Sequence, residues 1–161
     1  MNAVLSRSRC RRNKDPLPDR NEAGAILGFG KAGSGNYESH GVDAARDEIE
    51  KAIQAALACA GLTLSDIAGV GLGIAGADLP EDYTMLEKTT FTPLLGDIPR
   101  TLRNDSMGGL RGGTRKPYGI VIACGTGCVC AGVNIAGDET RVGGISEDFG
   151  DKISGTEIGI E

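Results

Sequence analysis

The chain has 161 residues, of which 40% are hydrophobic and 24% charged, and these proportions are typical of a soluble globular protein. Its formal net charge is -5 and only 4% of its residues are aromatic, with no Trp, so it has neither the basic surface nor the stacking side chains of a nucleic-acid-binding protein. No apolar run is long enough to span a bilayer, and no secretory leader follows Met1. We therefore expect a cytoplasmic protein with no nucleic-acid and no membrane partner.

The predicted elements divide the chain into three parts. Residues 1–24 are rich in Arg and Lys and poor in apolar residues, which predicts a basic disordered tail. Strands and helices then alternate over 25–114, as in part of an N-terminal α/β lobe, and 115–161 reads as the beginning of a second α/β lobe. In chain order, we expect a strand at 25–29, a glycine-rich loop at 30–41, a helix from the N-cap Asp43 to Gly61, a strand at 67–75, a weak helix at 81–88, a strand at 97–103, a helix at 106–112, and three antiparallel strands at 118–123, 128–134 and 138–142.

Two glycine patterns resemble a dinucleotide-binding fingerprint without its context. They begin at Gly28 and at Gly71, and each has the spacing G-x-G-x-x-G. The fingerprint requires a helix to start directly after the last glycine, so that its amides face a pyrophosphate, and loop residues follow both patterns here. Lys31 is followed by Ala32 rather than Ser or Thr, which excludes a phosphate-binding P-loop at that point.

A third glycine pattern, Gly125-Thr126-Gly127, joins two apolar strands. Glycines let backbone amides approach an anion closely, and Thr126 adds a hydroxyl donor, so the turn could hold a phosphate. The same residues would also make an ordinary hairpin turn. From the residues alone, both interpretations stand.

Asn104 and Asp105 lie at the carboxyl end of a predicted strand, the edge at which open α/β sheets bind ligands. Asp105 in that place could accept a proton from a sugar hydroxyl. The alternative is that Asp105 caps the helix predicted to begin at Ser106.

The five cysteines do not have the spacing of a disulfide framework. Cys124, Cys128 and Cys130 cluster in the hairpin, and the single histidine, His40, is distant in sequence. We expect these thiols to be small buried hydrophobic groups rather than metal ligands, and we predict no protein metal site.

Several stretches together resemble one known family. They are Gly33–Asn36 with Gly41, residues 69–78 (GVGLGIAGAD), Asn104-Asp105, residues 119–137 (GIVIACGTGCVCAGVNIAG) and residues 142–159 (VGGISEDFGDKISGTEIG). In order and spacing the chain resembles the BadF/BadG/BcrA/BcrD-type ATPase family, and within it N-acetylglucosamine kinase-like proteins. The resemblance implies part of an actin-like ATPase (ribonuclease H-like) α/β fold, with ATP and Mg²⁺ as cofactors and an amino sugar as substrate.

The resemblance also implies roles for individual residues. Asp105 would be the catalytic base, and Gly125, Thr126 and Gly127 would be the second phosphate loop that contacts ATP. Sugar-binding positions would be Asn36, Asn104, Gly143, Gly144 and Asp151.

The chain departs from the family in ways that affect the expected activity. Residues 1–24 contain no DGGGT-like first phosphate turn, and the sequence stops at Glu161, where the family continues. We expect a form shortened at both ends, with weak or absent kinase activity on N-acetylglucosamine or a related hexosamine. Alternatives are an ATPase activator of a CoA-ester reductase or dehydratase and a non-catalytic truncated product. An edge exposed by the missing first strand would favour a homodimer.

Overall fold

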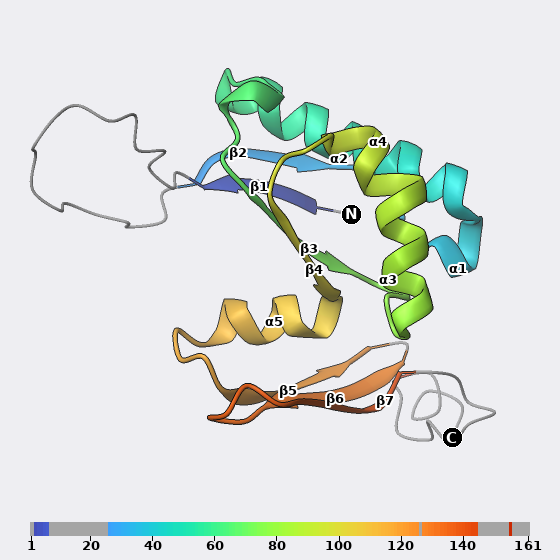
Figure 1. Ribbon diagram of the computed structural model, residues 1–161, viewed down its shortest axis with the longest axis vertical. Coiled ribbons are helices and arrows are strands. Elements are labelled where there is room, and N and C mark those ends of the chain that lie inside the picture. Colours follow the sequence, from blue (N-terminus) through green and yellow to red (C-terminus); the bar gives the residue numbers. More distant parts are fainter. Residues whose placement is uncertain (1, 7–25, 126, 145–154, 156–161) are drawn as a thin grey trace, which may run out of the picture. The chain divides into compact units, whose positions relative to one another are not determined.

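The computed structural model describes residues 2–6, 26–125, 127–144 and 155 (Figure 1). Its elements are β1 (Asn2–Ser6), β2 (Ile26–Lys31), α1 (Tyr37–His40), α2 (Val42–Ala60), a 3₁₀ turn (Leu64–Asp66), β3 (Val70–Ile74), α3 (Pro80–Leu86), a π-helical segment (Glu87–Phe91), α4 (Thr92–Leu95), β4 (Arg100–Asn104), α5 (Asp105–Gly113), β5 (Gly119–Cys124), β6 (Cys128–Val133) and β7 (Glu139–Gly143). No helix in the described ranges has the length and apolar character needed to cross a membrane.

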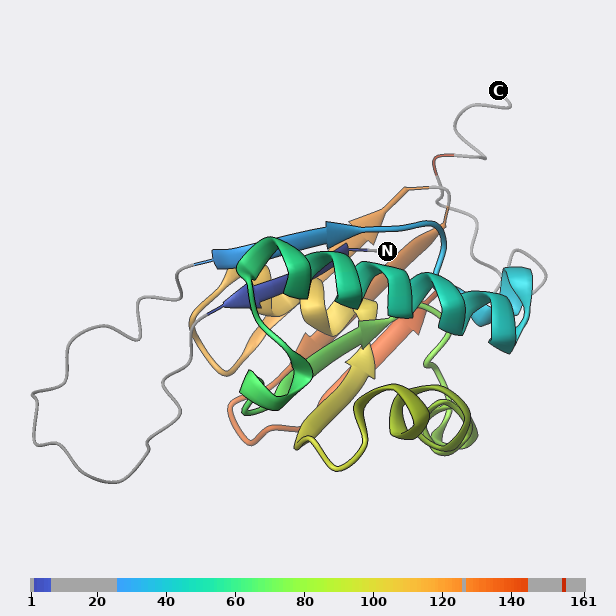
Figure 2. The ribbon, with the colours of Figure 1, turned by 90° about the horizontal axis from the view of Figure 1, so that it is seen from above.

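The chain forms two compact units and passes from one to the other three times: inside β3, between Ala77 and Asp78, and inside β4. The first comprises Met1–Gly71 with Asp78–Thr101, and the second Leu72–Ala77 with Leu102–Glu161. These units are defined by contacts between backbone positions, and their boundaries differ from the predicted boundary at 114/115. The division into two lobes at that boundary stays a prediction. β3 and β4 are hydrogen-bonded neighbours, and their arrows in Figure 2 point the same way, so their carboxyl ends share an edge.

The first unit contains a strand that the sequence reasoning missed. β1 pairs antiparallel with β2, and Asn2 lies opposite Lys31. The tail predicted over 1–24 is therefore wrong at residues 2–6, where the short apolar run Ala3–Leu5 pairs with β2 and the polar, basic composition of the rest of the tail obscured it. The rest of that tail lies outside the described residues. The homodimer was expected because a missing first strand would expose an edge. Strand β1 pairs along β2, so the homodimer loses that support and stays a prediction.

Helix α2 covers β2 and begins two residues earlier than predicted. Its N-cap is Gly41, not Asp43, which instead pairs with Arg46 at 3.1 Å in the first turn. Gly61 ends the helix in the left-handed region (φ 66), as the sequence predicts, and the Leu62 amide donates to the Leu57 carbonyl at 3.0 Å. The buried side chains of α2 recur every three or four residues and form one face of the helix: Ala45, Ile49, Ala52, Ala56 and Leu57.

The crossover from β3 to β4 is more helical than predicted. Pro93 has no amide proton to donate to the Thr89 carbonyl four residues earlier, and the Arg46 guanidinium reaches that carbonyl at 3.5 Å. The π-helical segment lies next to this interruption, and its last residues bury Thr90 and Phe91 almost completely. Arg100 on β4 holds the crossover through an ion pair with Glu87 and a hydrogen bond to Thr92 at 3.0 Å.

The second unit is a three-stranded antiparallel sheet, β5–β6–β7, with α5 on one face. The predicted hairpin and third strand are confirmed, and Val121, Ala131 and Val133 face the helix side chains Met107 and Leu110. Alternate residues point to the other face, where Ile120 and Ile122 are 76% and 69% exposed.

The glycines of the first fingerprint-like pattern serve packing. A Cβ atom on Gly30 would lie 2.0 Å from the Ala52 carbonyl oxygen, and one on Gly28 would lie 2.3 Å from that of Ala56. Glycine at both places lets the α2 backbone lie directly on β2. The pattern therefore marks a helix–strand contact within the first unit.

We predict that Gly30→Ala destabilises the fold by about 1–3 kcal/mol, because α2 must move away from β2. Gly71→Ala is the matched control, since a Cβ there would meet no atom within 4 Å, and we expect it to be neutral or stabilising by about 0.5–1 kcal/mol. Urea denaturation measures both. Equal free energies of unfolding in the two variants would contradict the close contact.

Candidate functional site

The junction of β4 and α5 is capped by Asn104. Its Oδ1 accepts hydrogen bonds from the Ser106 amide at 3.0 Å and from the Ser106 hydroxyl, and the side chain is buried. The helix therefore begins at Asp105, and the alternative in which Asp105 is the cap is wrong. The side-chain oxygen of Asn104 is used in this cap. Its predicted contact with a sugar stays a prediction.

Asp105 is the first residue of α5 and is exposed. Within the described ranges, no hydrogen bond or ion pair engages its carboxylate. Its backbone lies against β3, because a Cβ on Gly73 would be 3.5 Å from the Asp105 Cα. The carboxylate is thus presented at the edge where β3 and β4 end.

The turn between β5 and β6 is narrow and open on its outer side. The Gly125 amide donates to the Gly127 carbonyl at 2.8 Å, and the Gly155 amide donates to the Gly125 carbonyl at 2.7 Å. Among the described residues, none has an atom within 4 Å of a Cβ built on Gly125 or on Gly127. Thr126 lies outside the described residues.

The α5 N-terminus and this turn lie at the same end of the second unit. A Cβ on Gly119 would lie 3.1 Å from Leu110, and one on Gly109 would lie 3.7 Å from Val121. Helix α5 and strand β5 run in opposite directions, so the start of the helix lies at the same end as the end of the strand (Figure 1). Asp105 is therefore carried toward the β5–β6 turn.

The last residues of β7 lie beside the start of β6. Gly143 pairs with Val129, two residues after Gly127. Gly144 has a φ of 79, and a Cβ there would lie 3.0 Å from the Val129 Cβ, so both conformation and space favour glycine. These two predicted sugar positions are close to the turn along the sheet. Asp151 lies outside the described residues.

Asn36 belongs to the first unit and caps α1. The Asn36 Oδ1 accepts a hydrogen bond from the Glu38 backbone amide at 2.9 Å, and the Asn36 backbone amide donates to the Ser34 hydroxyl at 3.3 Å. The loop before it is tied to α2, because the Gly33 amide donates to the Glu48 carboxylate at 2.5 Å. A hydrogen bond from Lys51 and then the one from Gly33 lower the pKa of Glu48.

Tyr37, next to Asn36, was not identified from the sequence. Its hydroxyl donates to Asp82 at 2.8 Å, and Asp82 also accepts from the amides of Asp78 and Leu79 at the start of α3. Burial, and then the bond to Asp82, raise the pKa of Tyr37 above its usual range. Pro80 with Asp82 is a helix-start signal that indicates the α3 cap, whereas no local pattern indicates a contact between residues 45 positions apart.

We predict that Tyr37→Phe lowers the free energy of unfolding by about 1.5–3 kcal/mol, the value of a hydrogen bond to a charged group. The native phenol keeps its proton, whereas the unfolded one loses it near pH 10, so wild-type stability should fall as pH rises beyond about 10. That fall should be smaller in Tyr37→Phe. Tyr83→Phe is the control, and denaturation at pH 8 and above pH 10 provides the measurement. An equal pH dependence in the two variants would exclude the Tyr37–Asp82 bond.

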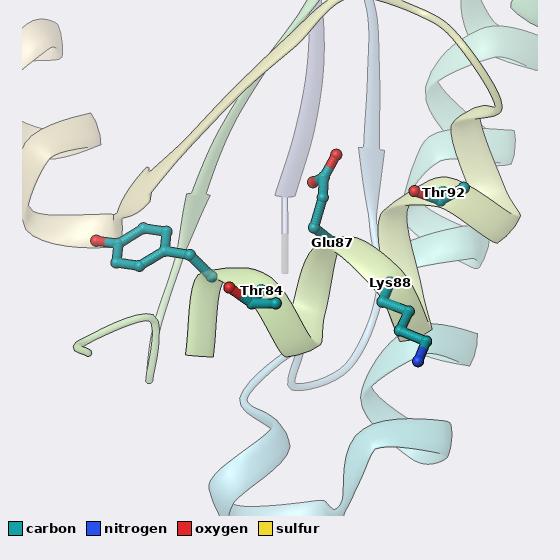
Figure 3. A pocket seen from close by; sticks show the side chains of 5 residues that line it. Thr84, Glu87, Lys88 and Thr92 are labelled. Atoms are coloured by element: carbon teal, nitrogen blue, oxygen red, sulfur yellow. The ribbon is translucent and has the colours of Figure 1, made fainter. Parts of the chain in front are cut away.

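The helical crossover carries an open pocket of about 550 Å³, lined by Tyr83, Thr84, Glu87, Lys88 and Thr92 (Figure 3). It contains none of the predicted site residues, and its Glu87 is engaged by Arg100. Among the described residues, no group of three or more His, Cys, Asp or Glu could hold a metal ion.

The prediction that the hairpin cysteines are buried is wrong. Cys124 is exposed, and Cys128 and Cys130 are half-exposed, because all three lie on the face of the sheet opposite α5. None of these thiols is in a disulfide.

Comparisons with known proteins agree on one group. Residues 18–161 match the BadF/BadG/BcrA/BcrD ATPase family. The chain is 36% identical over 135 residues to the N-acetyl-D-glucosamine kinase of Dictyostelium discoideum, covering 78% of this chain and 42% of that protein. It is 32% identical over 130 residues to an N-acetylmuramic acid/N-acetylglucosamine kinase of Clostridium acetobutylicum, covering 80% and 42%.

A crystal structure assigned as an N-acetylglucosamine kinase from Chromobacterium violaceum matches with a TM-score of 0.65 and 24% identity, over 83% of this chain and 46% of that one. This match confirms the predicted fold, part of an actin-like ATPase fold. The chain spans less than half the length of each of these three relatives.

Proposed function

Because the chain belongs to the BadF/BadG/BcrA/BcrD ATPase family, we propose that it serves the ATP-dependent phosphorylation of an amino sugar of the N-acetylglucosamine class. One observation carries the proposal. Asn104 caps α5, which leaves the exposed Asp105 carboxylate at the helix start, at the same end of the second unit as the Gly125–Gly127 turn. Kinase homologues from two organisms support the sugar class.

Asp105 would act as the base. An exposed carboxylate without a competing protein partner in the described ranges can accept the proton of a substrate hydroxyl as that oxygen attacks. Most of the remaining acceleration in phosphoryl transfer comes from positioning and from stabilisation of charge.

Gly125, Thr126 and Gly127 would hold the ATP phosphates. No described side chain crowds Gly125 or Gly127, and within the described residues no group accepts a hydrogen bond from the Gly127 amide, which would therefore donate to a phosphate oxygen. The Gly125 amide is engaged by Gly127, so it would exchange that carbonyl for a phosphate oxygen. ATP bound with Mg²⁺ would supply the transferred phosphoryl group and part of the charge neutralisation.

Asn36, Asn104, Gly143, Gly144 and Asp151 would contact the sugar. With its Oδ1 occupied by the Glu38 amide, Asn36 would offer its side-chain NH₂ group to a sugar oxygen. We expect transfer by this chain alone to be weak, because residues 1–24 contain no glycine-rich first phosphate turn.

We predict that Asp105→Asn lowers phosphoryl transfer at least about 10²-fold, the usual contribution of a general base, and leaves the unfolding midpoint unchanged. A single-turnover assay, with the chain in excess over labelled ATP and with N-acetylglucosamine present, detects weak transfer. Asn104→Ala removes both the helix cap and a proposed sugar contact, and unlike Asp105→Asn it should cost about 0.5–2 kcal/mol of stability through loss of the cap. An unchanged rate in Asp105→Asn would remove Asp105 from the mechanism.

A further inference from the structure

Two of the exposed thiols flank the proposed phosphate turn. Cys124 is the last residue of β5, Cys128 is the first of β6, and the two are directly paired across the hairpin. Both side chains lie on the sheet face opposite α5, where Cys124 is exposed and Cys128 half-exposed. Reagents in solution can therefore reach at least one of the two thiols.

The geometry of this pair suits a disulfide. Gly125 and Gly127, the next pair outward, share the hydrogen bond of 2.8 Å. Hydrogen-bonded and non-hydrogen-bonded pairs alternate along an antiparallel ladder, so Cys124 and Cys128 form a non-hydrogen-bonded pair. Such pairs have a Cα separation of about 4.5 Å, which lies within the range of about 4.4–6.8 Å that disulfides require.

We propose that Cys124 and Cys128 form a reversible disulfide that locks the Gly125–Gly127 turn. The oxidant would be a low-molecular-weight disulfide of the glutathione type. One cysteine thiolate attacks it, forms a mixed disulfide and releases one thiol. The second thiolate then displaces the other thiol, so the pair loses two electrons and two protons, and the oxidant is reduced to two thiols.

Cys130 is excluded from this bridge although it shares the same face. It is two residues from Cys128 on an extended strand, so their Cα atoms are about 6.6 Å apart with parallel Cβ bonds, whereas a disulfide requires Cβ atoms about 4 Å apart. From Cys124 it is a diagonal neighbour at about 7–8 Å, which is also too far. Cys130 is therefore the matched control within the protein.

The bridge would act on the turn through the adjacent hydrogen bond. With Cys124 and Cys128 held together, the Gly125 amide stays with the Gly127 carbonyl and is not released to an anion. This consequence rests on the proposed function, since it matters where ATP phosphates bind the turn. Oxidation would then lower ATP affinity by about tenfold, the effect of losing one hydrogen bond to a charged group.

Oxidation of the whole chain with oxidised glutathione, followed by peptide mapping without reductant, tests the pairing. We expect one internal link between Cys124 and Cys128 that dithiothreitol removes, still formed in Cys130→Ser and Cys59→Ser, and lost in Cys124→Ser and Cys128→Ser. Amide hydrogen exchange at Gly125 should slow on oxidation. A link that uses Cys10, Cys59 or Cys130, or glutathione adducts without an internal link, would overturn the proposal, as would unchanged exchange at Gly125.

ATP binding, measured by calorimetry on reduced and oxidised protein, separates the two proposals. Weaker binding after oxidation, absent in Cys124→Ser, supports both. If the link forms and slows exchange but the reduced protein binds no ATP, the thiol pair stands and the proposed function fails. If the reduced protein binds ATP and oxidation leaves the affinity unchanged, the turn is not controlled by this pair.

Discussion

The packing of α5 against the inner face of the β5–β7 sheet is the contact on which the candidate site depends. Met107 and Leu110 pack with Ala131 and Val133, and the Leu110 side chain lies over Gly119 at the start of β5. Because the helix runs opposite to β5, its first residue is carried toward the β5–β6 turn. Loss of this contact would separate Asp105 from the turn even if each local structure survived.

Close backbone approach explains some of the glycines. Gly28 and Gly30 let the α2 backbone lie on β2, because a Cβ at either place would overlap an α2 carbonyl oxygen. In contrast, a Cβ on Gly125 or Gly127 would meet no described atom within 4 Å, so these glycines are not required by packing among the described residues. The sequence pattern alone does not show whether a glycine is needed for close packing. The atoms around each glycine in the structure do.

The strands and the long helices between residues 25 and 143 were predictable, since apolar periodicity and glycine stops reflect local preferences. The short helix α1 falls in a segment predicted as a loop, and α4 was not predicted. β1 was not, because its order comes from pairing with β2 across a long separation in sequence. The π-helical segment and the Tyr37–Asp82 bond also depend on distant partners. At the candidate site, the sequence placed Asp105 at the end of its strand, but it did not identify the residue that caps the helix, because Asn104 and Asp105 are equally good caps by residue type.

A paramagnetic analogue tests the central claim most directly, because it reports distance from a bound nucleotide without requiring turnover. Mn²⁺–ATP added to isotopically labelled protein broadens nearby amide resonances. We expect strong broadening at Gly125, Gly127 and Asp105, and little at Gly113 and Gly119, which lie toward the opposite ends of α5 and β5. Equal broadening at the two ends, or none at Asp105 when Gly127 is broadened, would contradict a shared site for base and phosphate.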